Sequence, residues 1–490
     1  MFKLKSIAIA VAFACASQLP AQAYAQTSAQ ITTHDSELGS IRSEIKQMRE
    51  LYEKRIQELE KRLSEAEAKA GKAETAATTA AGKAEQSASK AETAALAAAS
   101  ARSAENSFNP AMSLILQGTF AKSSRDPSQY QITGFVPSGG EVAPPKRSFG
   151  VGETELHMSA SIDPYFRGVA IMAVAPEGGI EVEEGYFQTT ALPHGLTIKG
   201  GRYFSGLGYL NEQHQHAWDF QDAPLVYKAF LGNQLKQDGV QLKWLAPTDL
   251  FVELGAELTA GDKFPGSDRN KNGVGGSALF GHLGGDIGQS TAWRVGASQL
   301  WTSPKDRSYS DTDTLGGAVN NTFSGSAKLF ALDGVLKWAP NGNATYRNFK
   351  LQGEYFKLRQ DGTLTYNDSA GSAVFNSVSG PLQADQSGGY LQGVYQFYPR
   401  WRAGYRYDTL RYGNLTNGIV NNGAGPSAAN FPVLSSHSPT RNSLMLDFSP
   451  TEFSRFRLQF AADKSRLGVT DNQVMLQYVH SLGAHGAHKF

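Results

Sequence analysis

Apolar and polar side chains alternate residue by residue in short segments that begin at Ala111 and recur through the rest of the chain. A period of two is typical of a β-strand with one apolar and one polar face. In one segment, Phe456, Leu458 and Phe460 alternate with arginine and glutamine. Further segments of this kind lie at 153–162, 180–186, 346–355 and 401–408. The pattern predicts an antiparallel β-structure over 111–490.

Short turns and long loops separate these segments in strict alternation. The seven short turns, rich in Pro, Gly, Asn and Asp, lie at 163–165, 192–195, 246–249, 288–290, 340–343, 398–400 and 449–451. The eight loops lie near 122–148, 175–179, 205–237, 261–275, 303–323, 360–386, 412–438 and 464–470. Together they would join about sixteen strands, an even number as in bacterial outer-membrane barrels.

The polar faces of the predicted strands carry many charges. Arg or Lys on the lipid face at mid-bilayer would cost about 2–4 kcal/mol, so the apolar face would meet lipid and the charged face a wet lumen. The fold class is therefore predicted to be an all-β transmembrane antiparallel barrel. A soluble sandwich, with the apolar face as its core, is the alternative.

Both ends of the sequence favour the barrel. Residues 1–25 have the charged start, the short apolar run and the Ala-Tyr-Ala site of a secretory signal peptide. The only cysteine, Cys15, lies within that run and is poorly placed for a lipoprotein anchor, so we expect a mature chain without cysteine. Phe490 ends the last alternating segment and resembles the assembly signal of outer-membrane barrels.

The region before the predicted barrel has a different pattern. After a short segment at 26–37, residues 38–105 are almost free of glycine and proline, and the second half is rich in alanine. Apolar residues recur at steps of three and four, which is the seam of a coiled coil; they include Leu38, Ile41, Ile45 and Met48. We expect a periplasmic α-helical coiled coil, with a disordered alanine-rich spacer as the alternative.

Charges of opposite sign gather on different predicted strands. Early strands supply acidic groups and a histidine to the lumen, namely Glu153, Glu155, His157, Glu181 and Glu183. Later strands supply basic groups, namely Arg294, Lys350, Arg402, Arg406, Arg455 and Arg457. Closing the barrel would set the two signs across the same water, where lining charges govern ion selectivity. Ordinary solvated strand polarity is the alternative interpretation.

The third loop, 205–237, has the richest chemistry. It carries six residues expected to narrow the lumen, namely Glu212, His214, His216, Trp218, Asp219 and Asp222. His214 and His216, close to carboxylates, are candidate ligands for zinc or copper, although their spacing is not diagnostic. Hydrogen bonding within the loop is the alternative, and no cofactor is predicted.

Several function classes have no support in the sequence. The formal net charge of +1 gives no indication of nucleic-acid binding. There is no nucleophile elbow, zinc-protease motif or phosphate-binding glycine loop. We therefore predict that the protein is not an enzyme.

Four motifs resemble the porin O/P family, whose best-known members are trimeric phosphate channels. They are Glu153-Thr154-Glu155-Leu156, Glu184-Gly185-Tyr186-Phe187, Gly201-Arg202-Tyr203-Phe204 with Gly206-Leu207-Gly208, and Asp238-Gly239-Val240-Gln241-Leu242. The resemblance implies a porin barrel, a homotrimer and a third loop folded inward. Because this third loop carries histidines and acids where the family uses lysines and arginines, phosphate selectivity is not implied.

The predicted function is that of a Gram-negative outer-membrane porin for passive diffusion of small hydrophilic solutes or ions. The expected partners are those solutes, outer-membrane lipid and the barrel-assembly machinery. One alternative is an energised receptor of the TonB-dependent type that takes up a metal. Another is a coiled-coil tether of the outer membrane.

Overall fold

The computed structural model describes residues 110–483 apart from 140–141, 175–177, 271, 368–374, 376 and 421–424, together with scattered positions between 46 and 65. The predicted signal peptide (1–25), the segment 26–37 and Phe490 lie outside the described residues. So does most of the predicted coiled coil, which remains a prediction. Among its described positions, Arg62 Nε donates to Glu58 Oε1 at 3.3 Å, one helical turn away.

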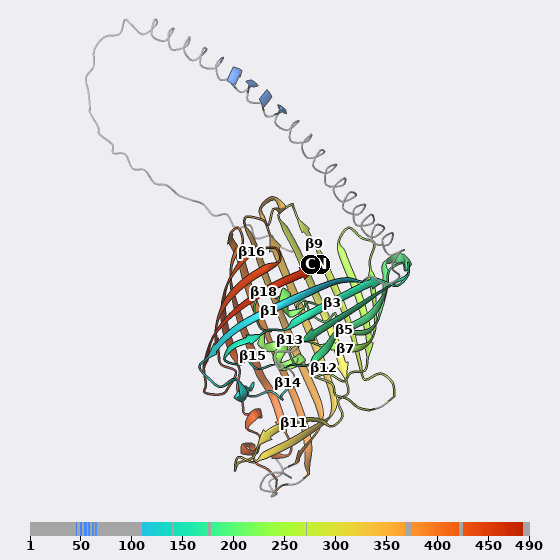
Figure 1. Cartoon of the computed structure of the whole chain (residues 1–490), viewed down its shortest axis with the longest axis vertical. Helices are drawn as coiled ribbons and strands as arrows, with labels where there is room; N and C mark the ends of the chain where they lie inside the picture. Colours follow the sequence, from blue (N-terminus) through green and yellow to red (C-terminus); the bar gives the residue numbers. More distant parts are fainter. Residues whose placement is uncertain are drawn as a thin grey trace, which may run out of the picture. The chain divides into compact units, whose positions relative to one another are not determined.

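Within the part of the chain that the structure describes, eighteen strands form one antiparallel sheet (Figure 1). They are β1 (Ala111–Ser123), β2 (Ser148–Val151), β3 (Thr154–Ser161), β4 (Phe166–Val174), β5 (Ile180–Thr189), β6 (Leu196–Phe204), β7 (Lys236–Leu245), β8 (Phe251–Thr259), β9 (Gly276–Ile287), β10 (Thr291–Thr302), β11 (Arg307–Thr312), β12 (Ala318–Trp338), β13 (Asn348–Asn367), β14 (Val378–Tyr398), β15 (Trp401–Asn417), β16 (Thr440–Thr451), β17 (Ser454–Asp463) and β18 (Asp471–Gly483).

Within the described residues from 110 to 483, the helical segments are short. They are η1 (Pro127–Gln129), η2 (Pro193–Gly195), η3 (Gln215–Ala217), α2 (Leu225–Leu231), η4 (Pro340–Gly342), η6 (Ala428–Asn430) and η7 (Pro432–Leu434). No described helix has the length and apolar character needed to cross a membrane.

The sheet closes on itself. β1 pairs with β18 from Ser113 opposite Gly483 to Ser123 opposite Gln473, and it pairs with β3 on its other side. The short β2 and β11 only extend the β1–β3 and β10–β12 connections, each pairing with one strand. The remaining sixteen strands form the closed barrel, so the predicted strand number is confirmed.

The predicted alternation of connections is also confirmed. Seven connections lie on one side of the barrel, which we call the turn side, and eight lie on the other, the loop side. Most of the loop-side connections are the longer ones, but the β4–β5 connection at 175–179 is short. β12 and β14 have 21 residues each, about twice the 9–11 needed to cross a bilayer. Together with β13, which pairs with both along their length, they extend further on the loop side than the early strands (Figure 1).

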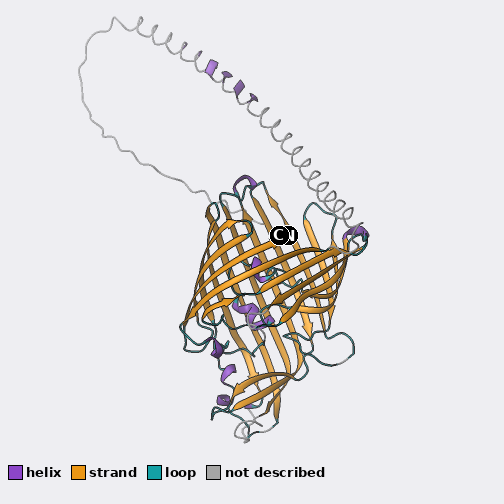
Figure 2. Ribbon diagram, in the orientation of Figure 1, coloured by secondary structure: helices purple, strands orange, loops and turns teal. Residues whose placement is uncertain are grey.

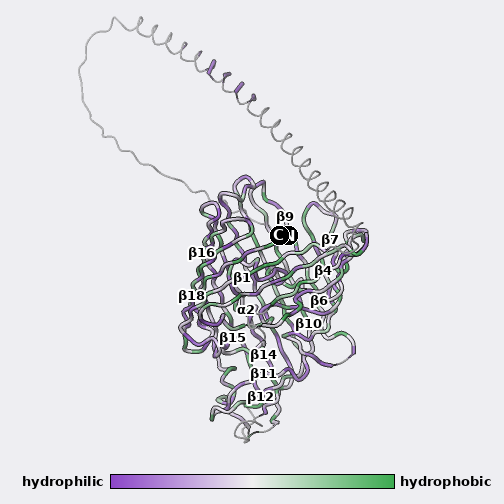
Figure 3. Tube along the Cα trace, viewed as in Figure 1, coloured by the Kyte–Doolittle hydropathy of each residue, from purple (hydrophilic) through white to green (hydrophobic). Residues whose placement is uncertain are grey.

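The two faces of the strands separate as predicted. Along β17, Phe456 is 44% exposed and Phe460 48%, while Arg457 and Gln459 between them are buried. Hydrophilic and hydrophobic positions alternate along the strands (Figure 3). The apolar face of the strands therefore points outward from the barrel, and the charged face points into its interior.

Candidate functional site

The third loop (residues 205–235, between β6 and β7) folds into the barrel. Its helix α2 lies within the ring of strands and contacts β13, β14 and β15 (Figure 2). All seven residues of α2 are buried, and Gly232 ends the helix with a left-handed φ of 64°. Phe230 belongs to one apolar cluster with Phe356 and Leu358 of β13. Apolar packing in this cluster holds the loop against the barrel wall.

Two wall carboxylates hold the loop by hydrogen bonds. Glu354 on β13 accepts from the backbone N–H of Tyr209 at 3.0 Å and from the Tyr227 hydroxyl at 2.9 Å. Glu257 on β8 accepts from the backbone N–H of Gly206 at 2.8 Å. Gly206 and Tyr209 lie at the start of the loop and Tyr227 lies in its later part, so the two carboxylates hold both parts of the loop.

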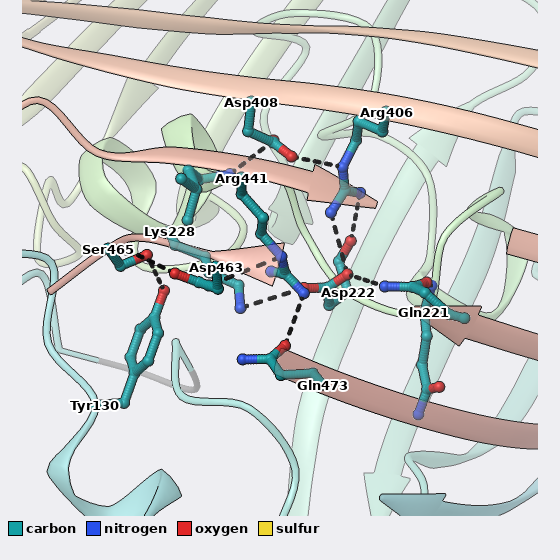
Figure 4. A network of polar contacts seen from close by, with 12 residues as sticks. Tyr130, Gln221, Asp222, Lys228, Arg406, Asp408, Arg441, Asp463, Ser465 and Gln473 are labelled. Atoms are coloured by element: carbon teal, nitrogen blue, oxygen red, sulfur yellow. Dashed lines mark hydrogen bonds and ion pairs between the residues drawn. The ribbon is translucent and has the colours of Figure 1, made fainter. Parts of the chain in front are cut away.

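An ion-pair network joins the loop to the late strands (Figure 4). Asp222 forms ion pairs with Arg441 of β16 and with Arg406 of β15, the latter at 3.1 Å, and accepts from Gln459 of β17 at 2.9 Å. Burial opposes ionisation of Asp222, but the charges of Arg441 and Arg406 outweigh it and hold the pKa of this carboxyl well below its usual value. Asp222 is therefore ionised at neutral pH.

A second group of contacts lies nearer the turn side. Asp219 accepts from Lys350 Nζ at 2.9 Å and from Arg402 Nη1 at 3.0 Å. Arg457 donates to the backbone carbonyl of Trp218 at 2.8 Å. Basic side chains of β13, β15 and β17 therefore bind this part of the loop by ion pairs and hydrogen bonds.

On the early strands β3 and β5 the loop contacts three glutamates through His214. Its Nδ1 lies 3.3 Å from Glu155 Oε2 and 3.2 Å from Glu183 Oε2, and its Nε2 lies 3.0 Å from Glu184 Oε2. Burial alone would lower the pKa of His214, but hydrogen bonds to these carboxylates outweigh it and hold the pKa well above its usual value. His216 Nδ1 contacts the other oxygen of Glu155 at 2.8 Å.

A β-bulge brings two adjacent glutamates to this cluster. The β4–β5 register shifts so that Ile171 opposes Glu184 and Met172 opposes Val182. Glu183 is therefore the additional residue, and both it and Glu184 are buried. A bulge breaks the in–out alternation locally and redirects a side chain, which explains how neighbours in sequence share the lumen face.

Cavities lie on both sides of the third loop. One on the loop side, the outer cavity, has a volume of about 280 Å³ and is bordered by Asn233 and Gln234 of the loop. Its charged lining residues are Glu153, Glu181, Glu183, Lys236 and Lys263. Lys236 Nζ donates to Glu181 at 2.8 Å.

Two adjoining cavities on the turn side, the inner cavities, have volumes of about 600 and 520 Å³ and share Asp286 and Ala292 as lining residues. Their basic lining residues are Lys199, Lys243, Arg294, Lys337, Lys350 and Arg402. Their acidic ones are Glu212, Glu253 and Asp286. Glu212, from the third loop, accepts from Lys243 at 2.8 Å.

The predicted site residues fall into separate environments. Glu155, Glu183, His214 and His216 come together, whereas Glu153 and Glu181 line the outer cavity. His157 lies on β3, two residues after Glu155. Arg455 Nη2 donates to the backbone carbonyl of His216 at 2.6 Å.

Arg406 and Arg457, expected on a wet lumen surface, are each only 1% exposed. Sequence reasoning missed Arg441, which shares Asp222 with Arg406. It also missed the loop-holding carboxylates Glu257 and Glu354, and Glu184 of the histidine cluster. Of these, Glu184 left a signal in the sequence, because the Glu183-Glu184 pair interrupts the alternation of its strand.

A closed barrel of sixteen antiparallel strands, with an apolar outer face and a charged interior crossed by an inward-folded loop, defines an outer-membrane β-barrel of the porin-like class. The protein is accordingly located in the bacterial outer membrane. The chain belongs to the same family as an uncharacterized protein of Aquifex aeolicus (strain VF5), with 31% identity over 427 residues that cover 79% of this chain and 81% of that protein. No protein-family model matches the chain, so the resemblance to porin O/P stays a prediction.

Among solved structures, a loop-L8 deletion mutant of OmpT, an outer membrane protein of Vibrio cholerae, covers 76% of this chain and 99% of its own, with 12% identity and a TM-score of 0.47. The outer membrane channel DcaP of Acinetobacter baumannii covers 76% and 97%, with 11% identity and a TM-score of 0.46. An anion-selective porin from Comamonas acidovorans covers 76% and 99%, with 9% identity and a TM-score of 0.43.

Proposed function

We propose that the protein is a porin, a water-filled channel through which small hydrophilic solutes or ions diffuse passively across the outer membrane. The observation that carries the proposal is the third loop, tied across the barrel interior with charged cavities on both sides of it. A loop fixed in this way narrows the passage and sets the size limit. The lining charges then select among the solutes that fit.

The charge of the lining changes along the passage. The outer cavity has three carboxylates and two ammonium groups, whereas the inner cavities have six basic and three acidic side chains. A solute entering from the loop side would therefore meet an acidic environment first and a basic one second. Solutes that carry both signs, or an oriented dipole, suit such a passage.

The inner cavities give a direct test of ion selectivity. Lys337 lines one of them, directly opposite Lys350 in the β12–β13 register. Lys337→Glu should shift the zero-current potential in a salt gradient towards cation preference, because it reverses one charge at the lining. Lys328→Glu is the matched control, since Lys328 lies on the exposed outer face of the same strand. Equal shifts in both variants would contradict this assignment of the lining.

Liposome swelling tests the proposed function. Liposomes that contain the purified full-length protein should swell in solutions of uncharged sugars, and the rate should fall steeply as sugar size increases. Swelling requires no energy source, which distinguishes a porin from an energised receptor. Absence of swelling with the smallest sugars, from protein shown to be folded, would refute the porin proposal.

We also propose that the protein is a homotrimer held in part by the predicted coiled coil and placed in the membrane by the barrel-assembly machinery. The support is the apolar seam that begins at Leu38 and the resemblance to a trimeric family. Native mass spectrometry should give a trimer, and deleting 26–105 should weaken it while leaving the barrel. A monomer from the intact chain would refute this proposal.

A further inference from the structure

We propose that Glu155, Glu183 and His214 form a binding site for a divalent transition-metal cation of the Zn²⁺ type. The site lies between β3, β5 and the third loop, and among the described residues these three offer a nitrogen and two oxygens within 4.8 Å of one another. The proposal goes beyond a porin function and stands without it; only its effect on current rests on the channel being open.

The spacing of the donor atoms fits a tetrahedral ion. Ligands about 2.0 Å from a tetrahedral Zn²⁺ lie roughly 3.3 Å from one another. His214 Nδ1 lies 3.3 Å from Glu155 Oε2 and 3.2 Å from Glu183 Oε2. An ion can therefore be received with small side-chain movements, leaving the fourth position for water or a solute.

The surrounding contacts orient these ligands. His214 Nε2 faces Glu184 Oε2 at 3.0 Å, and a metal-bound histidine characteristically donates its other ring N–H to a carboxylate. His214 Nδ1 is then the ring nitrogen that lies beside the two proposed carboxylate ligands, Glu155 and Glu183. His216 fixes the remaining oxygen of Glu155 at 2.8 Å.

The site is also accessible and suitably charged. Glu183 is both a proposed ligand and part of the outer cavity lining, beside Glu153 and Glu181. These carboxylates would attract cations towards the site. One imidazole and two carboxylates favour zinc-like ions over Mg²⁺, which prefers oxygen ligands alone and keeps much of its water.

Titration calorimetry on the purified full-length protein, prepared without a histidine tag, tests the proposal. Zn²⁺ should bind at one specific site per chain, and His214→Ala should lower the affinity of that site for Zn²⁺ by more than about 100-fold. Glu183→Gln, which preserves shape, should do the same, while Glu184→Gln should weaken it by about 10–100-fold as an orienting neighbour.

His282→Ala is the matched control. His282 is another buried histidine hydrogen-bonded to a carboxylate, Glu253, at 3.0 Å, but it belongs to no three-ligand group among the described residues. Its replacement should leave Zn²⁺ affinity unchanged.

Absence of this Zn²⁺ site in folded protein would overturn the proposal, and so would a site that persists in both His214→Ala and Glu183→Gln. If His214→Ala does not fold, Glu183→Gln decides alone.

Zn²⁺ should also reduce single-channel current in the native protein but not in these variants. A protein that binds Zn²⁺ yet never conducts would retain the metal site and refute only the porin proposal.

Discussion

Excising His214–Asp222 and joining the ends with a short glycine-serine linker should raise single-channel conductance several-fold and weaken ion selectivity. The excised residues run through the interior from the glutamate cluster to the late strands, so their loss removes charged side chains and volume from the passage. The measurement is conductance and zero-current potential in planar bilayers.

The barrel should survive this excision. Arg406 keeps Asp408 at 3.0 Å, and Arg457 keeps Asp447 at 2.8 Å, because these partners lie on the wall itself. A glycine-serine replacement of the exposed β11–β12 turn at 314–316 is the control and should leave conductance unchanged. Unaltered conductance in the excised protein, with folding verified, would show that the third loop does not limit the passage.

Replacing Asp222 alone by alanine should, in contrast, greatly lower the free energy of unfolding of the protein. Asp222 lies within ion-pair distance of Arg406, Arg441 and Lys228, and all three basic side chains are almost fully buried. In the substituted protein the loop still covers these side chains, but Lys228 loses its carboxylate partner. Arg406 keeps only the carboxylate of Asp408, and Arg441 only that of Asp463. Removing one member of a buried ion pair costs about 3–5 kcal/mol. The measurement is the free energy of unfolding of the barrel in lipid or detergent.

Asp385→Ala is the matched control for this prediction. Asp385 also pairs with two basic residues, Lys357 and Arg359, each at 3.0 Å, but this pairing is on the surface. Exposed pairs contribute about 0–1 kcal/mol. Comparable losses in the two variants would mean that the Asp222 network does not hold the loop.

The Asp222 contribution should also depend on pH with a definite sign. The folded-state pKa of Asp222 lies below its usual value, so the stabilisation is complete above the unfolded-state pKa of about 3.9 and is lost as pH falls further. The difference in unfolding free energy between the native protein and Asp222→Ala should therefore shrink in acid.

Strand number, topology and faces could be predicted from the sequence because each depends on local pattern. Alternation over about ten residues fixes which side chains share a face, and a charge on the lipid face is costly. Phe456 and Arg457 lie on opposite faces for this reason. The Glu183-Glu184 pair could have predicted a bulge by the same rule, because an unbroken strand would place one of them in lipid.

The environment of each interior charge could not be predicted in this way. Arg402 and Arg406 lie four residues apart on one face of β15, yet Arg402 lines an inner cavity and Arg406 is buried against Asp222. The difference arises from where the third loop meets the wall. That position depends on contacts such as Gln221 N–H to Gln459, separated by 238 residues in sequence, which no local pattern encodes.

Single-channel recording of the purified full-length protein in planar lipid bilayers tests the central claim most directly. The account predicts discrete conductance steps that need no energy source and grow with salt concentration, because ions cross a water-filled passage. A folded protein that gives no steps, in cells where solute uptake stops when the inner membrane is de-energised, would contradict a porin and favour an energised receptor.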